Sequence, residues 1–161
     1  MPYIKPEIRP EKDRVIEALK EGWLYNDELL YVLFEYCKQH IKPSYNNYKN
    51  YCGELRQCAT EIERRSGSKE ISIVDVDIVE PFLSKGRLEL CAKKIAFMKE
   101  GADIKVNGDL NYILYGFAIR NLNFEQFSFY SKQLRLSAKK IEKEILAPYE
   151  DLKIIENGDV L

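Results

Sequence analysis

Residues 45–63 read YNNYKNYCGELRQCATEIE, and residues 124–142, which begin 79 positions later, read FEQFSFYSKQLRLSAKKIE. Both stretches carry an aromatic residue at their first, fourth and seventh places, and then Leu-Arg, an alanine and Ile-Glu at matching places. Apolar residues that recur every three or four positions are typical of a helix with one buried face. We therefore expect two long amphipathic helices that are equivalent parts of a duplicated unit.

The duplication extends outward from these stretches at almost the same spacing. The matching segments, given as pairs, are 2–4 with 81–83, 20–22 with 99–101, and 29–34 with 110–115. A chance similarity between two amphipathic helices would not keep all of these segments in order. We expect one compact domain over residues 1–161, made of a degenerate first copy (1–80) and a second copy (81–161).

Each copy predicts three helices, so the expected fold class is all-α. The expected helices cover about 11–21, 27–40, a stretch from Ser44, 85–100, 109–121 and 123–146. Pro148 should end the last of them, because proline lacks the amide hydrogen that an inner turn needs. Two short extended segments at most are expected, in the β-branched linker 71–79 and in the tail 152–161. Two three-helix units that cover each other about a pseudo-twofold axis would mimic a homodimer.

Composition excludes several classes of protein. The chain of 161 residues has 25 basic and 26 acidic residues, so it is not a globally basic binder of polyanions. Neither a signal peptide nor an apolar run long enough to span a membrane is recognisable, and we expect a cytoplasmic protein without membrane contact. The four cysteines lack the spacing of metal ligands, and a single histidine offers no catalytic set. We expect no cofactor, no resident metal and no catalytic residues.

Three segments resemble a known family. They are MPYI at residues 1–4, GDLNY at 108–112, and APYEDLKIIENGDV at 147–160. Together they resemble an uncharacterised family of short proteins from prokaryotes and their phages, whose members open with MPYI, carry GDLNY at the start of a central helix and close with APYED and ENGDV. The resemblance implies a helical protein with no assigned activity. This chain departs from the family pattern because it holds two copies, of which the first lacks GDLNY and PYED.

The GDLNY segment supplies three candidate ligand-binding residues, Asp109, Asn111 and Tyr112. The simpler interpretation is that Asp109 stabilises the free amides at the start of a helix. Alternatively, the helix start is a phosphate site, although the charge of Asp109 opposes that role. Asn111 corresponds to Leu30 in the first copy, and this polar replacement predicts either a buried hydrogen bond or a ligand contact.

The APYED segment supplies three more candidates, Tyr149, Glu150 and Asp151. We expect Tyr149 to fold back against the N-terminal segment or the GDLNY helix, with both acids in solvent. The alternative joins these acids to Asp109 or to Glu142 as Mg²⁺ ligands, because hard cations prefer carboxylate oxygens. That arrangement would indicate a metal-dependent nucleotide hydrolase.

A basic stripe is the last candidate site. Lys132, Arg135, Lys139 and Lys143 fall within about 80° of one another on a helical wheel. Such a stripe is usually a solvated face, and the alternative is a local patch for nucleic acid or another polyanion. Nucleic acid is the less favoured partner, because no aromatic residue lies between these charges.

Aromatic residues favour a binding role over the other classes. Five tyrosines could line a pocket or an interface: Tyr31, Tyr112, Tyr115, Tyr130 and Tyr149. The leading hypothesis is a non-enzymatic binding or regulatory protein that acts through protein or small-ligand contacts, including self-association as a homodimer. A metal-dependent nucleotide hydrolase and a nucleic-acid accessory protein are the alternatives.

Overall fold

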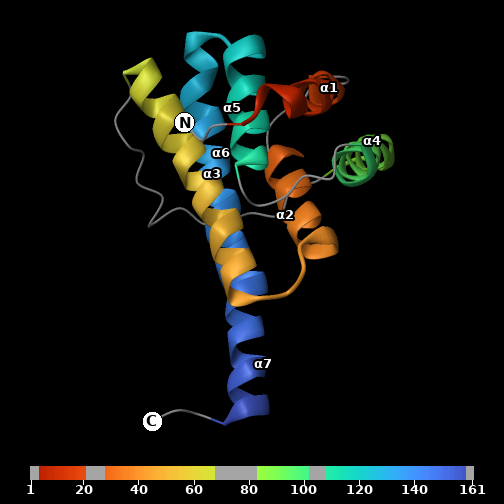
Figure 1. The fold of residues 1–161 in the computed structure, drawn as a ribbon, viewed down its shortest axis with the longest axis vertical. Helices are drawn as coiled ribbons and strands as arrows, with labels where there is room; N and C mark the ends of the chain where they lie inside the picture. Colours follow the sequence, from red (N-terminus) through yellow and green to blue (C-terminus); the bar gives the residue numbers. More distant parts are fainter. Residues whose placement is uncertain (1–3, 21–27, 68–82, 102–107, 159–161) are drawn as a thin grey trace.

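The computed structural model of the chain describes residues 4–20, 28–67, 83–101 and 108–158, and every regular element within them is helical (Figure 1). The α-helices are α1 (Arg9–Lys20), α2 (Glu28–His40), α3 (Tyr45–Ser66), α4 (Lys85–Ala96), α5 (Asp109–Asn121), α6 (Phe124–Ile141) and α7 (Ala147–Asn157). A 3₁₀ turn, η1 (Pro6–Ile8), precedes α1, and the π-helical turns η2 (Phe97–Gly101) and η3 (Glu142–Leu146) follow α4 and α6. No helix in these ranges combines the length and the apolar character needed to cross a membrane.

The two copies contain matching helices in the same order. The first helices, α1 and α4, have 12 residues each, and the second helices, α2 and α5, have 13 each. Their third helices also begin alike. The Ser44 hydroxyl accepts a hydrogen bond from the Asn47 amide at 3.0 Å, and the Asn123 side chain accepts one from the Gln126 amide at 3.1 Å. Side chains at these two N-cap positions, 79 residues apart, satisfy amides that the helix itself leaves free.

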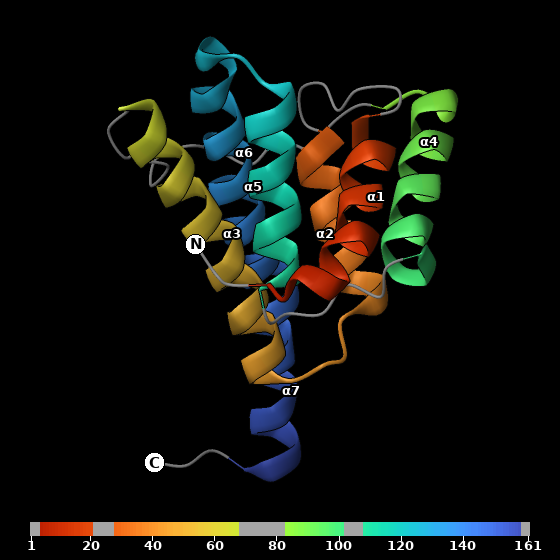
Figure 2. The same cartoon turned by 45° about the horizontal axis from the view of Figure 1, so that its top comes forward.

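The third helices form the centre of the molecule, and the other helices are exchanged around them. α3 and α6 run antiparallel and in close contact (Figures 1 and 2). α1 of the first copy packs on α5 of the second, and α4 of the second copy packs on α2 of the first. α3 also contacts α5, and α6 contacts α2 in the same way. The expected two-unit all-α repeat is therefore confirmed, and each repeat covers the apolar face of the other.

Two equivalent ion pairs join α3 to α6. Arg135 of α6 binds Glu63 of α3 through two hydrogen bonds of 2.5 and 3.0 Å, and Arg56 of α3 binds Glu142 at the end of α6. Each arginine and each glutamate of one pair lies 79 residues from its counterpart in the other, so the pseudo-twofold relation extends to side chains. The small side chain of Ala59, which is fully buried like that of its counterpart Ala138, permits close approach of the helices between the pairs.

Two buried tyrosines repeat the same contact in the two copies. The Tyr51 hydroxyl donates to the Leu33 carbonyl at 2.6 Å, and the Tyr130 hydroxyl donates to the Leu114 carbonyl at 2.8 Å. Each bond ties the third helix of a copy to the second helix of that copy. Burial raises the pKa of both phenols well above its ordinary value, so both remain donors in the physiological pH range.

Because the two tyrosine contacts are equivalent, we expect Tyr51→Phe and Tyr130→Phe to have similar effects. Each substitution removes one buried hydrogen bond and keeps the ring, so each should lower the free energy of unfolding by about 1 kcal/mol. Urea denaturation of the two variants measures this loss. A cost confined to one variant would show that the repeats do not share this contact energetically.

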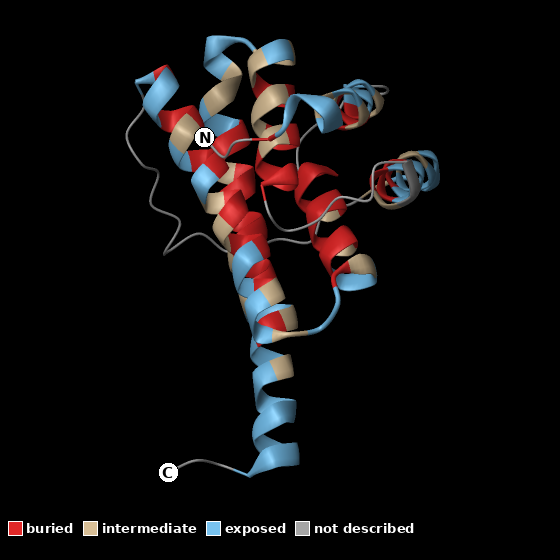
Figure 3. Cartoon of the chain, viewed as in Figure 1, coloured by how far each residue is buried: buried red, intermediate tan, exposed pale blue. Residues whose placement is uncertain are grey.

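The core lies between the helices of the upper body, whereas α7 extends beyond it (Figure 3). Leu33, Leu55, Leu114 and Leu134, one from each of the four central helices, are almost fully buried. In contrast, no residue of α7 is buried. The last helix therefore contributes little to the core of its own chain.

The expected end of the last helix at Pro148 is wrong. The π-helical turn η3 precedes this proline, which occupies the first turn of α7, where a missing amide hydrogen costs no internal bond. The chain therefore stays helical through Asn157, and residues 152–157 are helical instead of extended. In the first copy Gly67, with φ of 71°, ends α3 at the place where Leu146 continues the second copy. The other segment expected to be extended, 71–79, lies outside the described residues.

Candidate functional site

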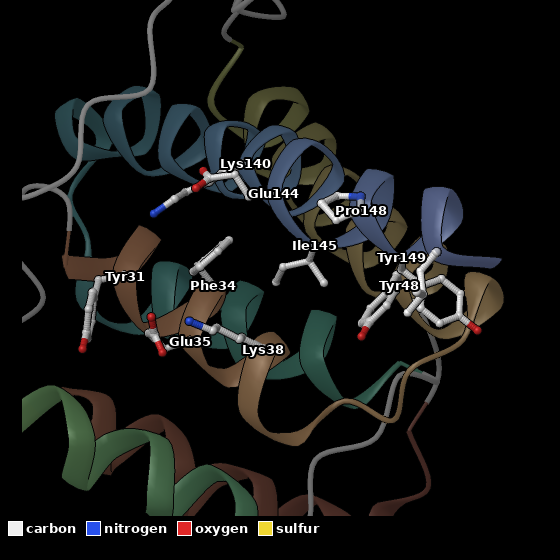
Figure 4. A pocket seen from close by; sticks show the side chains of 11 residues that line it. Tyr31, Phe34, Glu35, Lys38, Tyr48, Lys140, Glu144, Ile145, Pro148 and Tyr149 are labelled. Carbon is white, nitrogen blue, oxygen red and sulfur yellow. The ribbon is translucent and has the colours of Figure 1, made fainter. Parts of the chain in front are cut away.

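A groove of about 610 Å³ runs between α2 and the continuous helical segment formed by α6, η3 and α7 (Figure 4). One wall comes from α2 and the facing wall from the end of α6, from η3 and from α7, while Tyr48 of α3 lies at the α7 end. The residues that line the groove are Tyr31, Phe34, Glu35, Lys38, Tyr48, Lys140, Glu144, Ile145, Pro148, Tyr149 and Leu152. The APYED segment thus contributes to the site.

Helical spacing explains both walls. On α2, Tyr31, Phe34 and Lys38 are three or four residues apart and so share one face. The facing wall follows the same rule across η3, from Lys140 through Glu144 to Pro148. Because each wall belongs to a helix anchored in the core, the groove is part of the fold itself.

The α7 end of the groove is aromatic. The ring of Tyr149 meets the ring of Tyr48 edge to face, with centroids 5.6 Å apart and an interplanar angle of 83°. Burial raises the pKa of the Tyr48 phenol above its ordinary value, with smaller contributions from neighbouring Cys37 and Tyr149. The expectation that Tyr149 packs against the GDLNY helix is wrong, because continuation of the helix past Pro148 carries this ring to the start of α3. Residues 1–3, its other expected neighbours, lie outside the described residues.

The opposite end of the groove carries charge. The Lys140 ammonium lies 4.1 Å from the centre of the Phe34 ring, a distance that suits a cation–π contact. Glu35 and Glu144 add a carboxylate from each wall. Burial raises the pKa of the Tyr31 phenol, and the nearby Glu35 carboxylate raises it further. The groove is therefore apolar at one end and polar at the other, as Figure 4 shows.

An apolar stripe continues from the groove along α7. Pro148, Tyr149, Leu152 and Ile155 fall within about 120° on a helical wheel. Exposure rises along this stripe, to 51% for Leu152 and 79% for Ile155. Large apolar side chains at this level of exposure, side by side on a helix without tertiary partners in the described structure, mark an interaction surface. We call the groove and this stripe together the groove–α7 surface.

The GDLNY candidates lie elsewhere and hold α1 on α5. Asp109 forms an ion pair with Lys12 at 3.3 Å, and the Tyr112 hydroxyl donates to the Asp13 carboxylate at 2.9 Å. The first residue of α2, Glu28, pairs in the same way with Arg87 of the other copy. Gly108, with φ of 105° and no side chain, occupies the N-cap position that precedes Asp109.

A carboxylate from another helix takes the capping role that was expected of Asp109. Glu54 of α3 accepts a hydrogen bond from the Gly108 amide at the start of α5. Burial raises the pKa of the Glu54 carboxyl to about 7, partly offset by its backbone hydrogen bonds to Gly108 and Asn111. The pattern in sequence gave no sign of this contact, because it joins residues 54 positions apart.

Asn111 lies fully inside the protein, with 1% of its surface exposed. Neither atom of its side-chain amide has a hydrogen-bond partner among the described residues, and the same holds for one oxygen of Glu54. Of the two alternatives that the sequence offered for Asn111, the buried hydrogen bond does not form within the described chain. Asn111 and Tyr149 therefore belong to different regions of the molecule.

The carboxylates proposed as Mg²⁺ ligands are not brought together. Asp109 faces Lys12, and Glu142 faces Arg56, while Glu150 and Asp151 lie exposed on α7. Within the described ranges, no group of three or more histidine, cysteine, aspartate or glutamate side chains is placed to hold a metal ion. These contacts give no support to the hydrolase alternative.

The expected basic stripe is not continuous. Arg135 is buried against Glu63 and also donates to the Thr60 hydroxyl at 3.1 Å, so it is neither a solvated residue nor part of a polyanion patch. Its place on the wheel suggested solvent, but α3 crosses α6 on that side. Lys132 and Lys139 are half-buried, and Lys143 is exposed.

The tyrosines named from the sequence divide between the groove and other places. Tyr31 and Tyr149 line the groove, whereas Tyr130 belongs to the core. The Tyr115 hydroxyl accepts a hydrogen bond from Arg65 at 3.1 Å. The α2 side of the groove escaped sequence reasoning, although the spacing of its residues on α2 was visible.

Comparison with known proteins adds the family. A family model for the domain of unknown function DUF6899 matches the chain twice, over residues 1–69 and over residues 80–160. No curated protein and no solved structure gives a match. The two matched ranges coincide with the two copies that the sequence and the exchanged helices define. The chain therefore belongs to the DUF6899 family and carries this domain twice in tandem.

Proposed function

We propose that the protein is a non-enzymatic binding protein whose groove–α7 surface holds a segment of another polypeptide. The observation that carries the proposal is the continuity of the groove with the exposed stripe that ends at Leu152 and Ile155. An amphipathic helix lying along this surface would cover both parts at once, which is the helix-in-groove mode of recognition.

A small ligand fits the surface less well than a polypeptide does. The groove volume lies within the range of about 300–1,000 Å³ that is usual for small-molecule sites. A ligand of that size would nevertheless leave Ile155 uncovered, since this residue lies beyond the lining of the groove. A polypeptide removes the whole stripe from water, and each buried apolar side chain of this size contributes about 1.5–3 kcal/mol.

The cysteines favour the cytoplasm as the place where this binding occurs. Cys37, Cys52, Cys58 and Cys91 are free and buried, a state that a reducing compartment maintains. Burial raises the pKa of the Cys37 and Cys52 thiols to about 12, so they are protonated at neutral pH. These thiols act as small core residues.

Site-specific photo-crosslinking in the native host tests the proposed function. A benzoyl-phenylalanine at position 152 should give an adduct whose crosslinked peptide can be sequenced by mass spectrometry. The matched control is position 154 on the same helix, because Ile154 lies about 160° from the centre of the stripe. We expect adducts from position 152 and none from position 154. Equal labelling from both positions, or none from position 152, would contradict the proposal.

A further inference from the structure

We infer that the groove–α7 surface is occupied by a second copy of this chain, with α7 of each copy lying on the groove of the other in an isologous dimer. The inference rests on the proposed function and names its partner. Its first support is self-complementarity, since the chain presents an apolar helix next to an apolar groove. A twofold operation that seats one α7 on a partner's groove seats the other α7 as well.

Charge complementarity is the second support. The exposed part of α7 carries Glu150, Asp151 and Glu156 against one lysine, Lys153, and so has a net charge of −2. Around the end of α2 and the start of α3, the exposed lysines at the groove are Lys38, Lys42 and Lys49, and Glu35 is the acid beside them, which gives a net charge of +2. An acidic helix from a second copy therefore meets a basic rim, which favours its encounter and its orientation.

The size of the contact is the third support. A stable interface needs about 800 Å² and about 20–30 residues from each partner. One helix of 11 residues, about 16 Å long, falls short of this when it lies alone in a groove. The reciprocal arrangement uses both the helix and the groove of each copy, and so doubles the contact without any further surface.

The arrangement also fixes a contact that can be tested. In an antiparallel pair of α7 helices centred near Leu152, this residue lies opposite the same residue of the partner, and Tyr149 lies opposite the partner's Ile155. Ile154 points away from the pair, although it is exposed to a similar extent, at 47% against 51% for Leu152. The two positions therefore form a matched comparison on one helix.

Sedimentation and crosslinking of the full-length protein test the inference. Wild-type protein at about 50 µM should sediment as a dimer, and Leu152→Glu with Ile155→Glu should weaken dimerisation about 30-fold or more, as for interface hot spots. Ile154→Glu should sediment like the wild type. Both stripe residues are exposed, so the helix content measured by circular dichroism should not change. Under mild oxidation Leu152→Cys should form a covalent dimer and Ile154→Cys should not, because the native thiols are buried.

The possible outcomes separate the inference from the proposed function. A monomeric wild-type protein, or equal crosslinking from both cysteine variants, would overturn the dimer. If position 152 then gave an adduct with a different protein in the native host, the proposed function would stand and the second copy would be excluded as the occupant. A dimer that persists in the Leu152→Glu, Ile155→Glu variant would also overturn the inference, because it would place the interface elsewhere.

Discussion

Replacing Arg135 with glutamine should lower the free energy of unfolding by about 3–5 kcal/mol, the usual cost of breaking a buried ion pair. The arginine and Glu63 are 9% and 5% exposed at their side chains, and two hydrogen bonds join them. Glutamine is shorter and uncharged, so the Glu63 carboxylate would remain buried without its partner. Urea denaturation followed by circular dichroism measures the loss.

The duplicated pair supplies the control for this experiment. Arg56 and Glu142 are related to Arg135 and Glu63 by the pseudo-twofold axis, but their side chains are 43% and 29% exposed. Arg56→Gln should therefore cost less than about 1 kcal/mol, as for other solvent-screened pairs. Removing both buried charges, by Arg135→Met with Glu63→Leu, should recover most of the loss. Equal costs for the two single arginine variants would refute the assignment of the difference to burial.

The second large effect concerns Glu54 and pH. Its carboxyl has a pKa of about 7 in the folded protein, compared with 4.5 when unperturbed, because burial penalises the charged form. Between these values the folded state keeps a proton that the unfolded state has released, so the free energy of unfolding falls as pH rises from about 4.5 to 7. Above pH 7 this contribution is constant, and the whole loss amounts to about 3 kcal/mol.

Glu54→Gln should remove this pH dependence. The amide oxygen can still accept the hydrogen bond from Gly108, and no charge has to be buried at high pH. Relative to wild type, the variant should therefore gain about 3 kcal/mol of stability between pH 4.5 and pH 8. Glu61→Gln, a partly exposed position on the same helix, is the matched control and should show no such gain. Parallel curves for Glu54→Gln and wild type would show that Glu54 keeps an ordinary pKa.

Local patterns predicted the repeat, because its determinants are local. The aromatic residues, Leu-Arg and Ile-Glu recur at helical spacing, and each long helix begins after a capping side chain at Ser44 or Asn123. The same patterns could not show how the copies pack. A helical wheel placed Arg135 toward solvent, since it contains no information about the helix that crosses on that side.

The candidate site was predicted only in part for a similar reason. Tyr149 was chosen from its motif and does line the groove, but its neighbours depend on whether the helix continues at Pro148. A π-helical turn decides that question, and it follows from local backbone accommodation that hydrophobic periodicity does not report. Glu54 was missed because its cap joins α3 to α5, two helices that are distant in sequence.

The exchange of first helices between the repeats affects how the chain folds as it leaves the ribosome. α1 is made early, yet the helix on which it packs, α5, begins only at Asp109, in the last third of the chain. The N-terminal half therefore keeps an uncovered apolar face during most of its synthesis, a state that is prone to aggregation. Folding is completed only after translation of the second half, so the whole polypeptide, and not the repeat, is the unit on which natural selection for folding acts.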